Sequence, residues 1–296
     1  MDKIDRVTLI FEGIGGNKID ESKVNKDGRI NLEYYKELLS VGYAYINKFS
    51  HKYWYTSEEE LNTIKAWIER YIIDYCLFKY IDKKYQYAEV AAYSIGLITC
   101  LACLKSISFE EGLKLVCESY FYSKGYNNDE MLMLFEVGIN KDNVNELIVN
   151  NGLEDKVFIA ANISESYVLL SGIKKEVKKL AKIVRDNGAL KVSTIPAPTA
   201  FHTDLAKRGM ESFEKLVYSM DVRDSKVPIC SMYSKKYILK AEDLKKELCI
   251  NIYRKMDVNG CFKKIIENDK FNFIEVGLLK AIEKTCREID KRIVFL

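Results

Sequence analysis

Histidine is scarce in this chain of 296 residues, which contains only His51 and His202. A zinc site built from three histidines is therefore excluded, and a histidine that acts as a general base must be one of these two. Proline is also rare, with three residues that all follow position 195, so the sequence offers no Pro-rich linkers.

An excess of one charge and a long apolar run are also lacking. Forty-six basic and 43 acidic residues leave a net charge of +3, which argues against a dedicated nucleic-acid-binding protein. No apolar run approaches the ~18–20 residues of a membrane span. Charged residues among positions 2–6 argue against a signal peptide. We expect a soluble, cytoplasmic protein with reduced thiols and with neither a nucleic-acid nor a membrane partner.

Two of the eight cysteines, Cys100 and Cys103, have the CxxC spacing of some metal and redox sites. They lie within the apolar run 97–104, which has no turn, no second CxxC and no nearby histidine. This context favours buried structural thiols, and no metal or resident cofactor is expected.

Hydrophobic patterns predict strands that alternate with helices, as in an α/β fold with a mostly parallel sheet. Ser57 with Glu60 and Ser108 with Glu111 have the spacing of helix capping boxes. Strands are expected at 6–11, 88–93, 226–233 and 271–277, the last flanked by helical stretches, and further helices at 32–46, 57–75, 97–104, 108–124 and 204–220.

Residues 130–197 have a different pattern, which predicts the order β-α-β-β-α-β of a ferredoxin-like unit. Because such a unit can fold on its own, we interpret residues 129–198 as an inserted subdomain. Residues 1–128 and 199–296 would then form the main catalytic domain.

The segment 92–96 (AYSIG) places Ser94 between small residues at the junction of a predicted strand and helix. This is the pattern of a nucleophile elbow, in which a tight turn requires small residues two positions before and after the serine. The N–H of Ile95, at the start of the helix, is a natural donor to a developing oxyanion.

His202 follows a predicted strand and a proline turn and precedes a predicted helix. Considered alone, it would be interpreted as an exposed loop histidine. Beside a candidate elbow it becomes the better base for Ser94, whereas His51, among aromatic residues, is interpreted as structural.

Four segments resemble the malonyl-CoA:acyl-carrier-protein transacylase family, which includes the acyltransferases of polyketide synthases. They occur in the family's order. Residues 11–17 (FEGIGGN) correspond to the family's FPGQGSQ, and residues 92–96 (AYSIG) to its GHSxG. Residues 200–202 (AFH) correspond to its (A/S)FH, and residues 273–277 (FIEVG) to its (Y/F)xE(V/I)G. The resemblance covers nearly the whole chain and implies an α/β-hydrolase-like main domain with a parallel sheet and the inserted ferredoxin-like subdomain.

The resemblance also implies a Ser94–His202 dyad that forms an acyl-serine, with oxyanion donors on the main chain of Ile95 and Ile14. Asn251 would offer the main-chain or side-chain carbonyl that orients the histidine. The substrate would be a thioester of coenzyme A or of a phosphopantetheinyl acyl carrier protein, the expected partner, in polyketide or fatty-acid biosynthesis.

Departures from the family bear on the acyl group. Ser119 stands where malonyl-loading members carry an arginine that pairs with the substrate carboxylate, ~25 residues past the serine. Beside the elbow, Tyr93 replaces the family's histidine and Leu97 replaces its usual acidic residue. In the first motif, Ile14 and Asn17 replace two glutamines. With Asn162, the residues Tyr93, Leu97 and Ser119 are the substrate-binding candidates, and we expect a non-carboxylated acyl group to be preferred over malonyl.

Three functions are compatible with these residues. The first is transfer of such an acyl group to a carrier protein. The second is hydrolysis of acyl groups from carrier proteins, and the third is non-catalytic docking of a carrier protein. A basic rim for an acidic carrier protein is predicted at Lys174, Lys175, Lys178, Lys179, Lys182, Arg185, Lys207 and Arg208, although a solvated helix face explains each of them as well.

Overall fold

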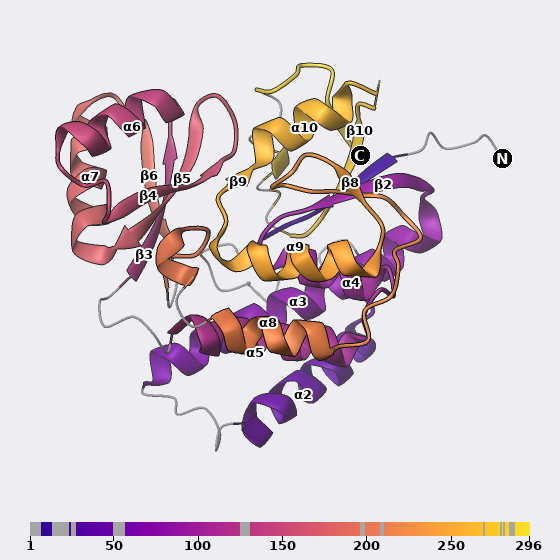
Figure 1. Ribbon diagram of the computed structural model, residues 1–296. Helices are drawn as coiled ribbons and strands as arrows, with labels where there is room; N and C mark the ends of the chain where they lie inside the picture. The colour runs from indigo at the N-terminus through magenta and orange to yellow at the C-terminus, as the bar shows by residue number, and fades with distance from the viewer. Residues whose placement is uncertain are drawn as a thin grey trace.

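The computed structural model (Figure 1) describes most of the chain. The described residues are 7–13, 24, 28–49, 57–124, 131–195, 199–207, 210–268, 270–278, 280, 282–283 and 288–296. Residues outside these ranges include Ile14, Asn17, His51 and Arg208, so the expectations that concern these four stay predictions.

Among the described residues, the main sheet has six strands in the order β11-β10-β1-β2-β7-β8. All neighbours are parallel except β7 and β8, which confirms the predicted mostly parallel sheet. Every residue of β1 is buried, as in a strand covered on both faces. The strands are β1 (Val7–Phe11), β2 (Tyr87–Ala92), β7 (Ile229–Cys230), β8 (Tyr237–Ile238), β10 (Asn272–Val276) and β11 (Val294–Phe295).

Helices pack around this sheet (Figure 1), and two of them, α3 and α5, begin where the sequence predicts caps. The Ser57 hydroxyl accepts from the Glu60 N–H, and Ser108 and Glu111 exchange both bonds of a capping box. In the described part of the chain, no helix is both long and apolar enough to cross a membrane. The helices are α2 (Leu32–Phe49), α3 (Glu58–Lys84), α4 (Gly96–Cys103), α5 (Phe109–Lys124), α8 (Met210–Ser219), α9 (Ala241–Tyr253) and α10 (Val258–Ile266).

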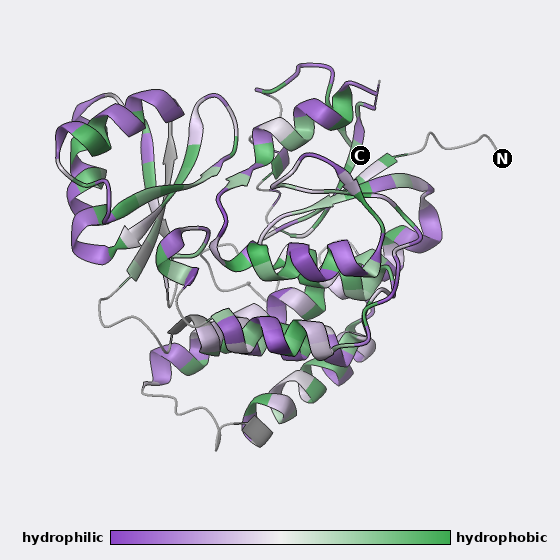
Figure 2. Cartoon of the chain, in the orientation of Figure 1, coloured by the Kyte–Doolittle hydropathy of each residue, from purple (hydrophilic) through white to green (hydrophobic). Residues whose placement is uncertain are grey.

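The inserted segment folds as predicted into β3 (Met131–Val137), α6 (Lys141–Asn150), β4 (Val157–Asn162), β5 (Tyr167–Ile173), α7 (Lys174–Asp186) and β6 (Lys191–Ile195). Its antiparallel strands lie in the order β6-β3-β5-β4 of a ferredoxin-like unit. Figure 2 shows hydrophilic residues on the outer faces of α6 and α7. Their apolar faces pack into a hydrophobic core that is separate from the core of the main domain.

The second sheet also has a strand that was not predicted. β9 (Met256–Asp257), which follows α9, pairs in parallel with β4, so the sheet continues into the C-terminal part of the chain. The proposed boundaries at residues 128 and 198 therefore separate segments that share one sheet.

Two predicted elements differ from the structure. The helix expected over 204–220 is divided into a short 3₁₀ helix, η1 (Asp204–Lys207), and α8. The strand expected over 226–233 has only two ladder residues, because Pro228 has no N–H and the hydroxyl of Ser225 closes a turn with Val227. Both α9 and α10 precede β10, and residues 279, 281 and 284–287 of the stretch after it lie outside the described residues.

A buried charge cluster lies under the carboxyl end of β1. Arg70 on α3 forms an ion pair with Glu12, which follows β1, and its Nε lies 2.9 Å from Oδ2 of Asp74. All three side chains are buried. Desolvation raises the pKa of Asp74 to about 7, although Arg70 opposes the shift. Since buried charges are costly without partners, Arg70 makes the two carboxyl groups tolerable in the core.

Replacing Arg70 by methionine should therefore lower the free energy of unfolding by about 3–5 kcal/mol, because it removes the cation that pairs with both buried carboxyl groups. Arg223→Met is the matched control, since Arg223 pairs with Asp221 on the surface and such pairs contribute about 0–1 kcal/mol. Denaturant unfolding measures both variants. Equal losses of stability would show that the buried cluster has no special role.

Candidate active site

The predicted elbow around Ser94 is present as a strand, a tight turn and a helix. β2 ends at Ala92, Ser94 has a φ of 55°, and α4 begins at Gly96. A positive φ at a residue other than glycine is strained, and a nucleophile elbow stores this kind of strain to expose the serine hydroxyl.

Gly96 lets this turn lie directly against the end of β1. A Cβ atom at Gly96 would come within 2.3 Å of the Glu12 carbonyl oxygen and 2.6 Å of the Phe11 carbonyl oxygen. Gly13 is similarly close, because its Cβ would lie 2.7 Å from the Tyr93 ring and 3.2 Å from the Ser94 Cβ. The chain segment that leads to Ile14 therefore passes beside the serine.

His202 lies beside Ser94, with its Nε2 3.2 Å from the serine Oγ. Its backbone N–H donates to the Ile252 carbonyl at 2.7 Å, which fixes it to the end of α9. The side chain is 2% exposed, and desolvation lowers its pKa to about 4 against the opposing effect of the Arg254 and Asn251 carbonyls. Nδ1 faces these carbonyls without a hydrogen bond of regular geometry. The imidazole is therefore a neutral acceptor at pH 7.

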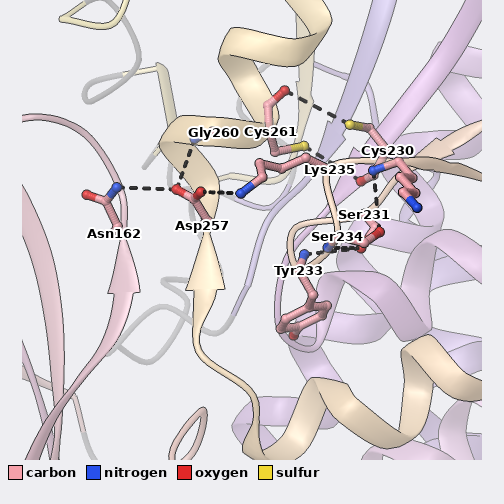
Figure 3. Close-up of polar contacts among 10 residues, drawn as sticks. Asn162, Cys230, Ser231, Tyr233, Ser234, Lys235, Asp257, Gly260 and Cys261 are labelled. Atoms are coloured by element: carbon pink, nitrogen blue, oxygen red, sulfur yellow. Dashed lines mark hydrogen bonds and ion pairs between the residues drawn. The ribbon is translucent and has the colours of Figure 1, made fainter.

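The Asn251 side chain binds the elbow rather than the histidine ring. Its Nδ2 donates to the Ser94 carbonyl oxygen at 3.0 Å, and its Oδ1 accepts from the Tyr233 hydroxyl at 2.6 Å. The Asn251 side-chain oxygen, one of the two groups predicted to orient the histidine, thus accepts from Tyr233 instead. The Asn251 main-chain carbonyl, the other predicted group, is the one that faces His202. Tyr233, which follows β7 (Figure 3), had no recognisable signal in the sequence because its contact depends on a residue 18 positions away.

A small cavity of about 20 Å³ lies next to Ser94 and His202. Ser119 reaches this cavity, as its distance in sequence from Ser94 predicted, but its hydroxyl donates to the Val116 carbonyl within α5. The cavity is lined by Trp67, Ser94, Ile95, Ile98, Ser119, Phe201, His202, Asn251 and Ile252, so no lysine or arginine is among these described lining residues.

Three other predicted substrate-binding residues do not line this cavity. The Tyr93 ring covers Gly13, and the Leu97 side chain is buried in the main core. Asn162 donates to Oδ1 of Asp257 at 3.2 Å, and Asp257 also binds Lys235 and the Gly260 N–H (Figure 3). Asn162 therefore joins the subdomain to the segment before α10, and its role at the substrate stays a prediction.

A larger groove of about 630 Å³ reaches His202 between the subdomain and the end of α9. Its walls come from α6 and β4 on one side and from residues 202–204 and 253–255 on the other. The groove is lined by two cationic side chains, Arg254 and Lys255, and by two acidic ones, Glu154 and Asp204.

The CxxC cysteines are not part of either cavity. Cys100 and Cys103 are buried free thiols in α4. Burial raises the pKa of both, so they stay protonated, as the structural interpretation requires.

Curated relatives and solved structures agree on one fold, although no family model matches the chain. A malonyl CoA-acyl carrier protein transacylase of Bacillus subtilis is 22% identical over 205 residues, which are 69% of this chain and 65% of that protein. A transacylase of Coxiella burnetii matches in structure with a TM-score of 0.80 at 18% identity, over 98% of this chain and 93% of the other. The fold is that of the malonyl-CoA:acyl-carrier-protein transacylases.

The transacylase fold also occurs in the acyltransferase domain of the second module of the salinomycin polyketide synthase. That domain matches with a TM-score of 0.77 at 17% identity, over 98% of this chain and 68% of the other. A type II polyketide synthase malonyl-transacylase in complex with its acyl-carrier protein matches with a TM-score of 0.81 at 15% identity, over 98% and 95%. The resemblance seen in four short segments therefore extends to the whole transacylase fold.

Gly96→Ala should displace the elbow, because the added Cβ has no room beside two carbonyl oxygens. We expect a loss of about 1–3 kcal/mol in unfolding free energy and slower labelling of Ser94 by a serine-reactive fluorophosphonate. Gly152→Ala, whose Cβ meets no neighbouring atom but whose φ of 64° strains an alanine, should lower stability as well and yet leave labelling unchanged. Labelling of Gly96→Ala at the wild-type rate would contradict the close-packing argument.

Proposed function

We propose that the chain is an acyltransferase that moves an acyl group from a coenzyme A or carrier-protein thioester through an acyl-serine at Ser94. The observation that carries the proposal is the 3.2 Å contact between the hydroxyl of a strained elbow serine and a buried, neutral histidine. The fold shared with the transacylases supports the same chemistry.

In this mechanism, Ser94 Oγ attacks the thioester carbonyl carbon while His202 Nε2 takes the hydroxyl proton. The oxyanion accepts hydrogen bonds from the Ile95 N–H and, as a prediction from the resemblance, from the Ile14 N–H. The intermediate collapses as the C–S bond breaks, and the thiolate leaves with the proton from His202. A second thiol then attacks the acyl-serine by the same steps in reverse.

The cavity beside Ser94 favours an uncharged acyl group. Ser119 stands in its wall with its hydroxyl already bonded, and no cationic side chain is among the described residues that line it. A carboxylate placed there would lose its hydration without gaining a partner, which costs at least several kcal/mol.

We expect kcat/KM for acylation with acetyl thioester to exceed that with malonyl thioester by at least ~10²-fold. That ratio corresponds to about 2.7 kcal/mol, which is no more than the cost of burying the malonyl carboxylate without a partner. Intact mass spectrometry of the protein over time, with the two acyl groups on the same thiol, measures both rates. Ser119→Ala should not change the ratio, because the native hydroxyl is turned toward its own helix. Efficient malonylation of Ser94 would contradict the proposed preference.

The lowered pKa of His202 predicts an unusual pH profile. Only the neutral imidazole accepts the proton, so the acylation rate falls as pH drops through the pKa of about 4. It should stay constant to within about twofold from pH 7.5 to 5.5, where an ordinary histidine with pKa near 6.5 would already be about nine-tenths protonated. Single-turnover acylation at each pH tests this, with circular dichroism to check folding. His51→Gln should give the same profile, and a tenfold fall by pH 5.5 would overturn the assignment.

The proposed partner is an acyl carrier protein, whose pantetheine arm would enter along the groove that leads to His202. The basic face of α7 offers positive charge to an acidic carrier, whereas in the groove Arg254 and Lys255 are balanced by Glu154 and Asp204. The structure of a type II polyketide synthase malonyl-transacylase in complex with its acyl-carrier protein, in the same fold, supports this pairing.

Hydrolysis is the second candidate function, because water can replace the second thiol at the acyl-serine. To distinguish the two, the protein is incubated with an acetylated carrier protein and an excess of unacylated carrier protein. Acetyl groups on the second carrier support transfer, whereas free acetate at the same rate supports hydrolysis. Binding of the carrier protein without any acyl adduct on Ser94 would leave only the docking function.

A further inference from the structure

We propose that Trp67 closes the acyl end of the cavity and restricts the enzyme to acyl groups as short as acetyl. This inference rests on the proposed function, and it specifies which uncharged acyl groups Ser94 accepts. The departures in sequence allowed either acetyl or a longer chain, so the size of the cavity decides between them.

The space available to an acyl group is small. The cavity beside Ser94 measures about 20 Å³, which is room for little more than one water-sized group. Apart from the dyad, Ser119 and Asn251, its wall is apolar, from Trp67, Ile95, Ile98, Phe201 and Ile252. An acetyl methyl group fits such a space, whereas each added methylene needs volume that the wall occupies.

Trp67 is held rigidly in this wall. It lies on α3 and is 3% exposed. Its ring meets Tyr120 of α5 edge-on, with centroids 5.3 Å apart, and lies tilted against Phe201 at 5.6 Å. Aromatic contacts on two sides fix the indole, so it cannot turn aside for a longer chain at low cost.

Trp67 is also the wall residue that can change without disturbing the reacting groups. Phe201 precedes His202 directly, and Ile98 lies one turn after Ser94 on α4. α3 carries no reacting group, so its indole determines the depth of the cavity independently of the dyad. Trp67 is thus a specificity-determining residue that touches the acyl group but takes no part in proton transfer.

The size limit leads to a graded preference. In a hydrophobic pocket, two substrates that differ by one methylene differ in kcat/KM by about 10–200-fold. Removing the indole should leave an apolar space next to Ser94, and engineered apolar cavities on the order of 150 Å³ stay dry and take apolar ligands. The variant would then accept chains that the native protein rejects.

The experiment compares acetyl, butyryl, hexanoyl and octanoyl thioesters of N-acetylcysteamine with the full-length protein. Single-turnover acylation of Ser94 is followed by intact mass for wild type, Trp67→Ala and Trp67→Phe. We expect wild type to lose at least ~10-fold in rate from acetyl to butyryl. Trp67→Ala should react with hexanoyl at least ~10-fold faster than wild type does, and Trp67→Phe should lie between them.

Phe213→Ala is the matched control, because Phe213 is a buried aromatic residue on α8 that packs against Tyr122 and does not line the cavity. It should destabilise the core and keep the wild-type preference for acetyl. Trp67→Phe keeps most of the packing, so the comparison remains decisive if Trp67→Ala does not fold.

Two outcomes overturn the proposal in different ways. If wild type accepts octanoyl as fast as acetyl, or if both Trp67 variants keep the wild-type profile, the assignment of Trp67 is wrong while the acyltransferase function stands. If no thioester acylates Ser94 in wild type, the proposed function itself fails, and the inference fails with it.

Discussion

The close approach of Gly96 to the end of β1 is the constraint on which the rest of the site depends. β1 and β2 pair in a register that sets Phe11 opposite Ala92, so the chain leaves both strands at the same edge of the sheet. With no side chain at Gly96, the elbow can rest on the Phe11 and Glu12 carbonyls. This contact exposes Ser94 toward His202 and holds its strained backbone in place.

A second set of contacts brings the C-terminal half of the chain to the same point. His202 is bonded through its backbone to Ile252, and Asn251 is bonded through its side chain to the Ser94 carbonyl. The two halves of the dyad, 108 residues apart in sequence, are thus joined through one turn of α9. Burial keeps the imidazole neutral, and the nearby carbonyls of Arg254 and Asn251 favour the imidazolium that forms during proton transfer.

Much of this was accessible from the sequence because it depends on local patterns. Hydrophobic periodicity predicted all six elements of the ferredoxin-like unit, and the small residues around Ser94 predicted the elbow. Counting from Ser94 also brought Ser119 to the cavity, since Ser94 lies in the turn before α4 and Ser119 lies on α5, which packs against α4.

What could not be predicted depends on contacts between distant residues. The pairing of Arg70 with Glu12, the bond from Tyr233 to Asn251 and the strand β9 have no local signature. Distance from a motif in sequence also does not say which way a side chain points, and Leu97 and Asn162 do not line the cavity beside Ser94. Trp67 looked like one apolar residue of a helical stripe, and only its neighbours show that it limits a cavity.

The central claim is that Ser94 carries the acyl group and that His202 activates it. The most direct measurement is peptide mapping after brief incubation with isotopically labelled acetyl thioester, for wild type, Ser94→Ala and His202→Ala. The account predicts label on Ser94 in wild type, none in Ser94→Ala, and labelling slowed by about 10²–10⁴-fold in His202→Ala. Label at another residue, equal labelling in Ser94→Ala, or an undiminished rate in His202→Ala would contradict it.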